Sequence, residues 1–451
     1  MSSNRKMGTA RRLTRALAVT ALVVAPLAAC DTNSILQVND PDVVQTSVFS
    51  NPTNLAAVRN GAIREFARAY GGTQNTDGGQ ILYSGLLGDE FYASGTFATR
   101  RDIDERHILQ TNASNEQAYF WLQRARNHAE QAADIFAADD SAGTADDAYM
   151  YNLAGYTYDM FGENYCSGVP FSRLPATGPT DYGAPQTTPE IFQRAIMRFD
   201  TAMAMAQLAN STDQMNLARV GKARALLDLD SVSEAAAVAS AVPTDFTFDV
   251  RYDASVQDAW NAVWEFNNSE KRWSVAGGEG GNGLPYLTDN DPRTPTAASG
   301  TGFNGDVPHY DELKYTGAGS AMPLATGIEA RLIEAEAALR SGDRTTFFQI
   351  HNALRATVGL PALSDTGQTT DQLVTLHFRE RAYWLWLTSH RLGDMRRLVR
   401  QYGRSIDSVF PTGLSPNGAP FGTDVNLPIP FSEQNNPKFK AAGGKCLDRN
   451  P

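Results

Sequence analysis

This sequence of 451 residues lacks the motifs on which most catalytic and metal sites depend. It contains three cysteines and six histidines, and the histidines are scattered without the spacing of a metal-ligand set. It contains no G-x-S-x-G, H-E-x-x-H or P-loop pattern. A glycosidase needs two carboxylates at a fixed separation, which sequence alone cannot identify among 50 acidic residues. We therefore predict no catalytic residue, no cofactor and no metal site.

One short acidic stretch has the oxygen ligands that calcium prefers. Asp289, Asn290 and Asp291 are consecutive, but no EF-hand spacing surrounds them. A solvated turn is the simpler interpretation of these three residues, and we do not assign a metal to them.

Basic residues are scarce, with 39 Lys and Arg against 50 Asp and Glu. Residues 1–29 hold five of the basic residues and no acid, so the chain from Cys30 carries 34 against 50, a formal charge of −16. So acidic a chain suits neither nucleic acid nor an electrostatic attraction to anionic lipid. We expect no nucleic-acid partner.

Long hydrophobic runs are also missing, apart from one near the start. Residues 16–29 form a 14-residue apolar run behind five basic residues. The run is shorter than the roughly 20 residues that span a bilayer, and its order is that of a secretory signal. It ends in Leu27-Ala28-Ala29-Cys30, which is similar to a bacterial lipobox. We expect residues 1–29 to be a lipoprotein signal peptide and lipid on Cys30 to anchor the chain to a membrane, with residues 30–50 as a tether. An ordinary signal peptide with a chance cysteine is the alternative.

Two cysteines remain once Cys30 is assigned to lipidation. In an oxidising compartment an even pair indicates a disulfide, here between Cys166 and Cys446. Such a bond would tie the C-terminus to the first half of the chain. The alternative is two unrelated buried thiols.

Apolar residues recur at helical spacing along most of the chain after residue 51. We expect helices over residues 51–70, 114–138, 145–162, 188–208, 212–229, 231–241, 326–340 and 345–358. The last four form two helix-turn-helix hairpins, rich in alanines that permit close helix approach. The pattern predicts an all-α fold of tetratricopeptide-like hairpins in a single domain, residues 51–451, although no strict repeat of that class fits.

Residues 370–402 contain no proline and no glycine before Gly393, and their apolar residues are three and four apart. We predict one long, mostly buried helix. Asp394 lies three residues from both Arg391 and Arg397, so its carboxylate can pair with either. An exposed face covered with salt bridges is the alternative interpretation of these charges.

Two segments interrupt the helical pattern, at about residues 71–112 and 267–323. Both are rich in glycine and carry aromatic residues, and the second also contains several prolines. Insertions of this length in a compact helical protein are usually functional or disordered.

Five landmarks resemble the SusD-like (RagB/SusD) family of outer-membrane nutrient-binding lipoproteins. They are the lipobox and residues 148–172, 327–342, 370–402 and 427–437. Residues 370–402 are similar to the family pattern E-R-x-x-E-L-x-x-E-G-x-R-x-x-D-L-R-R at Glu380, Arg381, Leu385, Arg391, Asp394, Met395, Arg396 and Arg397. They depart from it at Trp384, Thr388 and Ser389. In the family this helix is a structural spine, so the resemblance assigns its residues to folding.

The resemblance also implies where a ligand binds, on a shallow surface formed by loops of the two irregular segments. Aromatic faces suit the apolar faces of sugar rings, while neighbouring polar groups bond the hydroxyls. The candidate ligand-binding residues are Trp273, Tyr286 and Tyr310, with Asp89, Tyr92 and Arg100 opposite them. The alternative is that each aromatic residue pins its own loop to the helices. We expect Trp260 and Trp264, four residues apart, in the core.

By this resemblance the protein is a non-catalytic outer-membrane lipoprotein on the cell surface. It would bind a glycan or another polymeric nutrient and deliver it to a SusC-like TonB-dependent transporter. Two alternatives stand beside it. One is a tetratricopeptide-type envelope scaffold, which would bind proteins in a concave groove of hairpin helices. The other, from a different class, is a secreted hydrolase.

Overall fold

The structure is a computed structural model that describes residues 54–73, 78–139, 142–174 and 179–451. The expected signal peptide, Cys30 and the tether lie outside these residues. Residues 51–451 form one compact unit. Among the described helices, none combines the length and the apolar character needed to cross a membrane.

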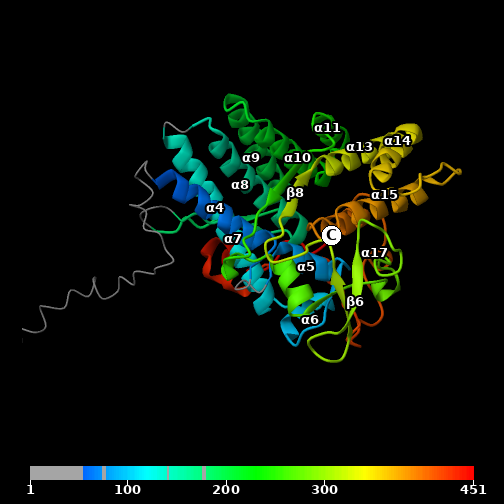
Figure 1. The fold of residues 1–451 in the computed structure, drawn as a ribbon. Helices are drawn as coiled ribbons and strands as arrows, with labels where there is room; N and C mark the ends of the chain where they lie inside the picture. The colour runs from blue at the N-terminus through cyan, green and yellow to red at the C-terminus, as the bar shows by residue number, and fades with distance from the viewer. Residues whose placement is uncertain (1–53, 74–77, 140–141, 175–178) are drawn as a thin grey trace, which may run out of the picture. The chain divides into compact units, whose positions relative to one another are not determined.

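The long helices of this unit are paired, and successive helices pack against each other (Figure 1). They are α4 (Leu55–Tyr70), α7 (Ala113–Ala138), α8 (Ala145–Asn164), α9 (Thr188–Leu208), α10 (Thr212–Asp228), α11 (Val232–Ala239), α13 (Gly327–Ser341) and α14 (Arg344–Thr357). The prediction of an all-α fold built from helical hairpins is confirmed.

Local sequence explains both the ends of these helices and their close packing. Thr187 and Glu190 form a capping box at the start of α9. Phe199 of α9 fits against two glycines, Gly155 of α8 and Gly221 of α10. A Cβ atom added to either glycine would lie 2.6 or 2.2 Å from the Phe199 ring, respectively. The bare backbones of α8 and α10 therefore make room for this ring.

The single helix predicted over residues 370–402 is wrong. The chain forms α15 (Thr370–Trp384) and α16 (Arg391–Arg400), separated by a turn. In that turn Leu387 and Ser389 have left-handed φ angles of 55° and 66°. Distant groups hold it: the Leu387 backbone N–H donates to Glu90 Oε1 at 2.9 Å, and the Ser389 hydroxyl lies 3.1 Å from that of Ser84. Periodicity within the segment cannot reveal such partners.

Most charged residues of α15 and α16 are buried, so the alternative of an exposed, salt-bridged face is also wrong. The buried ones are Glu380, Arg381, Arg391, Asp394, Arg396 and Arg397. Asp394 accepts hydrogen bonds from Arg381 Nε at 2.8 Å and from Arg397 Nη1 at 3.0 Å. Of the two arginines three residues away, Arg397 pairs with Asp394 and Arg391 does not. Arg391 forms a bidentate ion pair with Asp89, at 3.0 and 3.1 Å.

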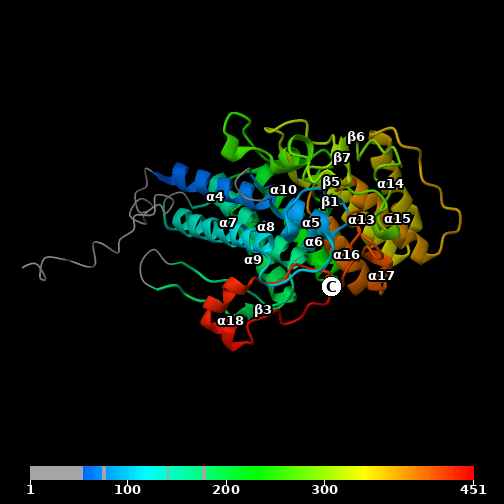
Figure 2. The ribbon, with the colours of Figure 1, turned by 90° about the horizontal axis from the view of Figure 1, so that it is seen from below.

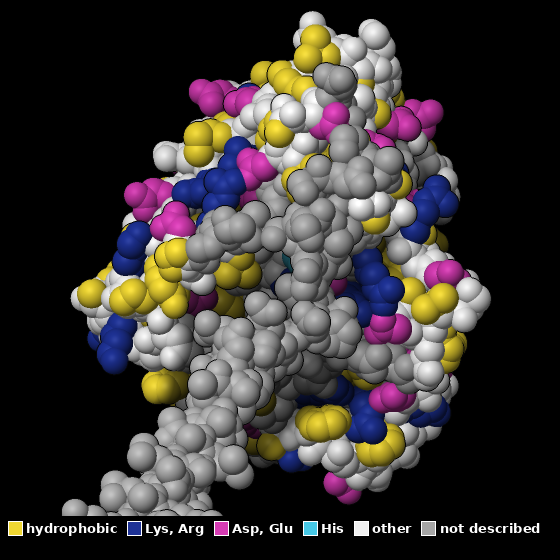
Figure 3. All heavy atoms as spheres, turned by 90° about the vertical axis from the view of Figure 1, so that its left-hand side faces the viewer, with side chains coloured by type: hydrophobic (Ala, Val, Ile, Leu, Met, Phe, Trp, Pro, Cys, Tyr) yellow, Lys and Arg dark blue, Asp and Glu magenta, His cyan; other side chains and the backbone are white. Residues whose placement is uncertain are grey.

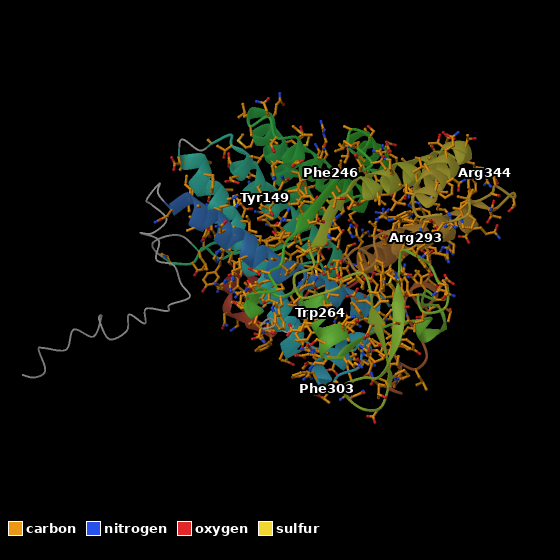
Figure 4. All side chains as sticks on the ribbon, in the orientation of Figure 1. Tyr149, Phe246, Trp264, Arg293, Phe303 and Arg344 are labelled. Atoms are coloured by element: carbon orange, nitrogen blue, oxygen red, sulfur yellow. A yellow bond between two sulfur atoms is a disulfide. The ribbon has the colours of Figure 1, made fainter. Side chains whose placement is uncertain are left out.

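A second buried ion-pair network surrounds Glu380 of α15. Its carboxylate accepts hydrogen bonds from Arg355 of α14 at 2.6 Å and from Arg293 at 2.7 and 3.3 Å. Arg293, labelled in Figure 4, belongs to the second irregular segment. It also pairs with Asp291. Glu380 therefore ties α14 and residues 267–323 to α15.

The two irregular segments contain short helices and strands that the sequence pattern does not predict. The first holds α5 (Gln80–Leu87), β1 (Phe91–Ala93) and α6 (Ala98–Asp104). The second begins after α12 (Ala262–Trp264) and holds η5 (Glu265–Ser269), β5 (Trp273–Val275), η6 (Glu279–Gly281), β6 (Thr296–Thr301), β7 (Pro308–Glu312) and β8 (Met322–Thr326). β1 pairs antiparallel with β5, and β6 with β7. Figure 2 shows β6, β7, β5 and β1 in succession, so the two segments meet as one structure.

The remaining strands and the C-terminal segment complete the unit. β4 (Thr247–Val250) pairs with β8, and β2 (Val169–Pro170) pairs with β3 (Pro185–Gln186). Cys166 and Cys446 form a disulfide. The Cys166 backbone N–H donates to the Leu427 carbonyl at 3.0 Å, and that of Ser167 donates to Asp448 at 3.0 Å. The chain's last residues are thus fixed beside the end of α8.

Candidate ligand-binding surface

The structure places five of the six predicted ligand-binding residues in the interior. They are Trp273, Tyr286, Asp89, Tyr92 and Arg100, all at most 4% exposed, whereas Tyr310 on β7 is half-buried. A ring inside the protein cannot lie against a sugar. For these five residues the alternative role, packing a loop against the body, is the one that the structure supports.

Each of the five has a structural partner that explains its burial. Asp89 receives the bidentate ion pair from Arg391, and the Tyr286 ring packs 5.3 Å from that of Tyr383. The Trp273 indole meets the Tyr83 ring edge to face at 5.3 Å. The Tyr92 hydroxyl donates to the Pro308 carbonyl at 2.5 Å, and burial raises the pKa of Tyr92 to about 12.

Arg100 lies between a buried ring and an exposed one. Its guanidinium lies 5.4 Å from the centre of the Trp273 ring and 4.5 Å from that of Phe97. Burial lowers the pKa of Arg100 to about 10. Five of the six predicted residues therefore belong to the buried layer of the two irregular segments.

The core position predicted for Trp260 and Trp264 is wrong. Both are half-buried, and their indole rings meet edge to face at 6.3 Å. Trp260 precedes the N-cap residue Asn261, and α12 spans only Ala262–Trp264, so the two residues do not share a helical face. The Trp260 indole N–H donates to the Ala254 carbonyl at 3.0 Å.

Two phenylalanines form the outer layer. Phe97 is 47% exposed and Phe303 is 52% exposed, and the guanidinium of Arg272 lies near both rings. It is 3.8 Å from the centre of the Phe303 ring and 5.4 Å from that of Phe97. Phe97 precedes α6, and Phe303 lies at the tip of the β6–β7 hairpin (Figure 4). We call Phe97, Glu270, Arg272, Phe303 and Asn304 the Phe97–Phe303 surface.

Backbone hydrogen bonds hold this surface in place. Ser94 N–H donates to the Arg272 carbonyl at 2.9 Å, Phe303 N–H to the Lys271 carbonyl at 2.8 Å, and Asn304 N–H to the Ser94 carbonyl at 2.9 Å. Gly302 allows the hairpin to approach this closely, since a Cβ atom there would lie 2.6 Å from the Ser94 Cβ. The exposed rings are therefore mounted on a fixed backbone.

The surface combines apolar faces with charged hydrogen-bonding groups. Glu270 accepts a hydrogen bond from Arg272 Nε at 2.5 Å, and the Asn304 amide N–H donates to Asn417 at 3.2 Å. Ring faces accommodate the C–H groups of a sugar, and a guanidinium and a carboxylate bond its hydroxyls. Sequence contains one signal for these rings: Phe303 stands between Gly302 and Gly305, in a turn with no helical face to bury it.

The described residues offer less support for a metal site or a nucleic-acid site. They contain no cluster of three or more His, Cys, Asp or Glu arranged to hold a metal. Asp291 pairs with Arg293, and Asp289 accepts from Arg379 and Tyr383, so protein groups occupy these two carboxylates. Figure 3 shows basic side chains interspersed with acidic ones on one face, without a continuous basic stripe.

Two surface cavities lie on helices instead of on the irregular segments. One, of about 370 Å³, lies between α7 and residues 432–433. The other, of about 470 Å³, lies along α14 and includes Arg344 (Figure 4). The scaffold alternative would require a groove lined by successive hairpins, and neither cavity is lined in that way.

Below the Phe97–Phe303 surface, Asp104 joins α6 to β1. Its Oδ2 accepts from the Ala93 backbone N–H at 2.8 Å. Burial raises the pKa of Asp104 to about 8, from an ordinary 3.8. Burial together with the nearby Asp104 also raises the pKa of Glu279. The folded protein therefore keeps a proton on this carboxyl pair at neutral pH.

As pH rises from 5 to about 8, the stability of the Asp104→Asn variant is expected to increase relative to that of the wild type. The unfolded chain releases the Asp104 proton near pH 3.8 and the folded chain only near 8, so the contribution of Asp104 to stability falls across that window. Thermal melting of both proteins at several pH values measures the effect. Asp306→Asn, exposed in the β6–β7 loop, is the control, and a difference between Asp104→Asn and wild type that stays constant with pH would refute the assignment.

Comparison with known proteins identifies the fold. No protein-family model and no curated protein sequence matches the chain. Among solved structures, a SusD-like carbohydrate-binding protein from Bacteroides fragilis NCTC 9343 superposes with a TM-score of 0.66 at 14% identity, over 87% of this chain and 99% of its own. A SusD superfamily protein from Parabacteroides distasonis ATCC 8503 gives 0.65 at 14% identity, over 86% and 98%. Another from Bacteroides thetaiotaomicron gives 0.62 at 14% identity, over 90% and 100%. The chain has the SusD-like fold.

Proposed function

We propose that this chain, with its SusD-like fold, is a non-catalytic binding protein that captures a glycan or another polymeric nutrient at the Phe97–Phe303 surface. The observation that carries the proposal is the pair of exposed rings about Arg272, contributed by both irregular segments. The fold adds support, because solved structures that share it include SusD-like carbohydrate-binding proteins.

The geometry explains how capture would work. The rings of Phe97 and Phe303 would lie against sugar faces, while Arg272 and Glu270 bond hydroxyl groups. Because backbone hydrogen bonds already order the chain beneath the rings, little backbone entropy is lost on binding. An open pair of rings suits a length of polymer better than an enclosed monosaccharide.

The proposal includes a place and a partner. The lipobox-like sequence ending at Cys30 supports a lipid anchor, and the resemblance of five landmarks supports an outer-membrane location on the cell surface. There the protein would pass its ligand to a SusC-like TonB-dependent transporter.

A glycan array followed by isothermal titration tests the proposal. Phe303→Ala is expected to weaken binding of the best oligosaccharide about tenfold, since loss of a stacking ring removes roughly 1–2 kcal/mol. Phe120→Ala is the matched control, because Phe120 on α7 is also 52% exposed. The oligosaccharide should be recovered uncleaved. Absence of binding to any glycan, or an equal loss in both variants, would count against capture at this surface.

A further inference from the structure

The cavity of about 370 Å³ beside α7 lies apart from the Phe97–Phe303 surface and shares no residue with it. One wall is α7, and the other is Ser432 and Glu433 of η7 (Phe431–Asn435). The helix contributes Ala113, Glu116, Gln117, Tyr119, Phe120 and Gln123. Most of these residues are three or four positions apart, so they share one face of α7. The volume lies in the range of roughly 300–1,000 Å³ that is usual for ligand pockets.

Two carboxylates of this cavity, those of Glu116 and Glu433, have no cation paired with them among the described residues. Both side chains are half-buried, and the described lining contains no Lys or Arg. Arg126 acts on Glu433 from a distance, but it is buried, and its Nη2 donates to the Ser172 carbonyl at 2.6 Å and to Gln123 at 3.0 Å. The negative charge in the cavity is therefore only partly balanced.

The two carboxylates are held differently. Glu433 Oε1 accepts from the Tyr119 hydroxyl at 3.0 Å, and that hydroxyl accepts from the Gln123 amide at 3.0 Å. Burial raises the pKa of Glu433, so a cation beside this carboxylate would offset part of the cost of keeping it charged. The Glu116 carboxylate has no hydrogen-bond partner within the described chain, and its oxygens are not closed off from solvent. Glu116 is therefore open to a ligand in the cavity.

Exposed apolar side chains lie next to these carboxylates. Phe120, one turn after Glu116 on α7, is 52% exposed, Phe431 is 56% exposed and Leu109 is 69% exposed. The Phe431 backbone N–H donates to the Gln110 carbonyl at 2.9 Å, which places Phe431 beside Leu109. Exposed apolar residues with charged neighbours are typical of surfaces that bind protein segments. Leu109 has no flat ring on which a sugar could stack, so a partner with alkyl side chains suits it better.

We propose that this cavity binds a basic, partly apolar segment of another polypeptide chain. A lysine side chain of that segment enters the cavity, where its methylene groups lie on the Phe120 ring and its ammonium group pairs with Glu116 and Glu433. Apolar residues on either side of the lysine pack against Phe431 and Leu109. Because the chain has a formal charge of −11, long-range electrostatic attraction also favours a basic partner.

Isothermal titration of the full-length protein with three tripeptides tests the proposal. All three are acetylated and amidated, have leucine at both ends and differ only at the centre, which is lysine, norleucine or glutamate. We expect saturable binding of the lysine peptide, and at least about tenfold weaker binding of the norleucine peptide, which lacks only the charged group. The glutamate peptide should not bind. Added salt should weaken binding of the lysine peptide, because the attraction is electrostatic.

Glucosamine is the fourth probe, since it also carries an ammonium group. If it binds as tightly as the lysine peptide, the cavity recognises an amino sugar, and the polypeptide partner is refuted. Failure of the lysine peptide to bind, or equal binding of the lysine and norleucine peptides, would also overturn the proposal.

Variants assign the binding to the two carboxylates. Glu116→Gln and Glu433→Gln are each expected to weaken binding of the lysine peptide about fivefold, the upper end for a partly exposed ion pair, and the double variant at least about tenfold. Glutamine still accepts a hydrogen bond from the Tyr119 hydroxyl, so the fold is preserved. Glu234→Gln removes the same charge from the exposed start of α11 and is the matched control. Unchanged affinity in the double variant, or an equal loss in the control, would refute the site.

A pair of phenylalanine variants separates this site from the glycan proposal. Phe120→Ala should weaken binding of the lysine peptide about fivefold and leave oligosaccharide binding unchanged, whereas Phe303→Ala should do the reverse. The two proposals can therefore fail independently. Loss of lysine-peptide binding in Phe303→Ala, with Phe120→Ala unaffected, would contradict the placement of this site on α7.

Discussion

Replacing Glu380 by Gln is expected to lower the free energy of unfolding by about 3–5 kcal/mol. The carboxylate is fully buried and accepts from both Arg293 and Arg355. Gln has the same shape but no charge, so it leaves two guanidiniums in the interior without their shared counter-ion. Because those arginines come from the second irregular segment and from α14, the loss should also loosen both elements against α15.

Denaturant unfolding measures this loss, and Glu334→Gln is the matched control. Glu334 pairs with Arg331 on α13, but both side chains are about one-fifth exposed. A partly exposed ion pair contributes only about 0–1 kcal/mol. Equal losses in the two variants would show that the buried ion pairs of Glu380 contribute no more to the free energy of unfolding than the partly exposed pair of Glu334.

Removing the disulfide is the second large effect that we expect. Cys166 and Cys446 are 280 residues apart, and closing so long a loop is worth roughly 5 kcal/mol on the chain-entropy model. The double variant Cys166→Ser/Cys446→Ser should therefore unfold at a markedly lower denaturant concentration than the wild type. The segment beside the bond, from Leu427 to Asp448, should be the first to exchange its backbone amides.

Reductant provides the control for this experiment. Wild-type protein in reductant should match the double variant, and the double variant should not respond to reductant at all. If reduction leaves the unfolding midpoint of the wild type unchanged, the two cysteines do not constrain the chain.

The helical body could be predicted because its signals are local. Apolar spacing, the Thr187–Glu190 capping box and the turn ending at Gly342 lie within the segments that they organise. The break between α15 and α16 could not be predicted, because its causes, Glu90 and Ser84, lie about 300 residues away. The wrong prediction of one helix reflects that difference in range.

The candidate surface shows the same limit. Sequence located the two irregular segments, but irregular chain has no periodicity that separates an inward side chain from an outward one. Trp273 on β5 is buried against Tyr83, whereas Phe303 at a hairpin tip is exposed, and both are aromatic residues in glycine-rich surroundings. Which ring is buried and which is exposed depends on the pairing of β1 with β5 and of β6 with β7, and β1 and β5 lie far apart in the sequence.

A crystal structure of the protein with its best-binding oligosaccharide tests glycan capture most directly. We predict sugar rings against Phe97 and Phe303, with hydroxyl groups hydrogen-bonded to Arg272 and Glu270. Sugar bound elsewhere, for example in the cavity between α7 and residues 432–433 with the two phenylalanine rings uncovered, would contradict the account.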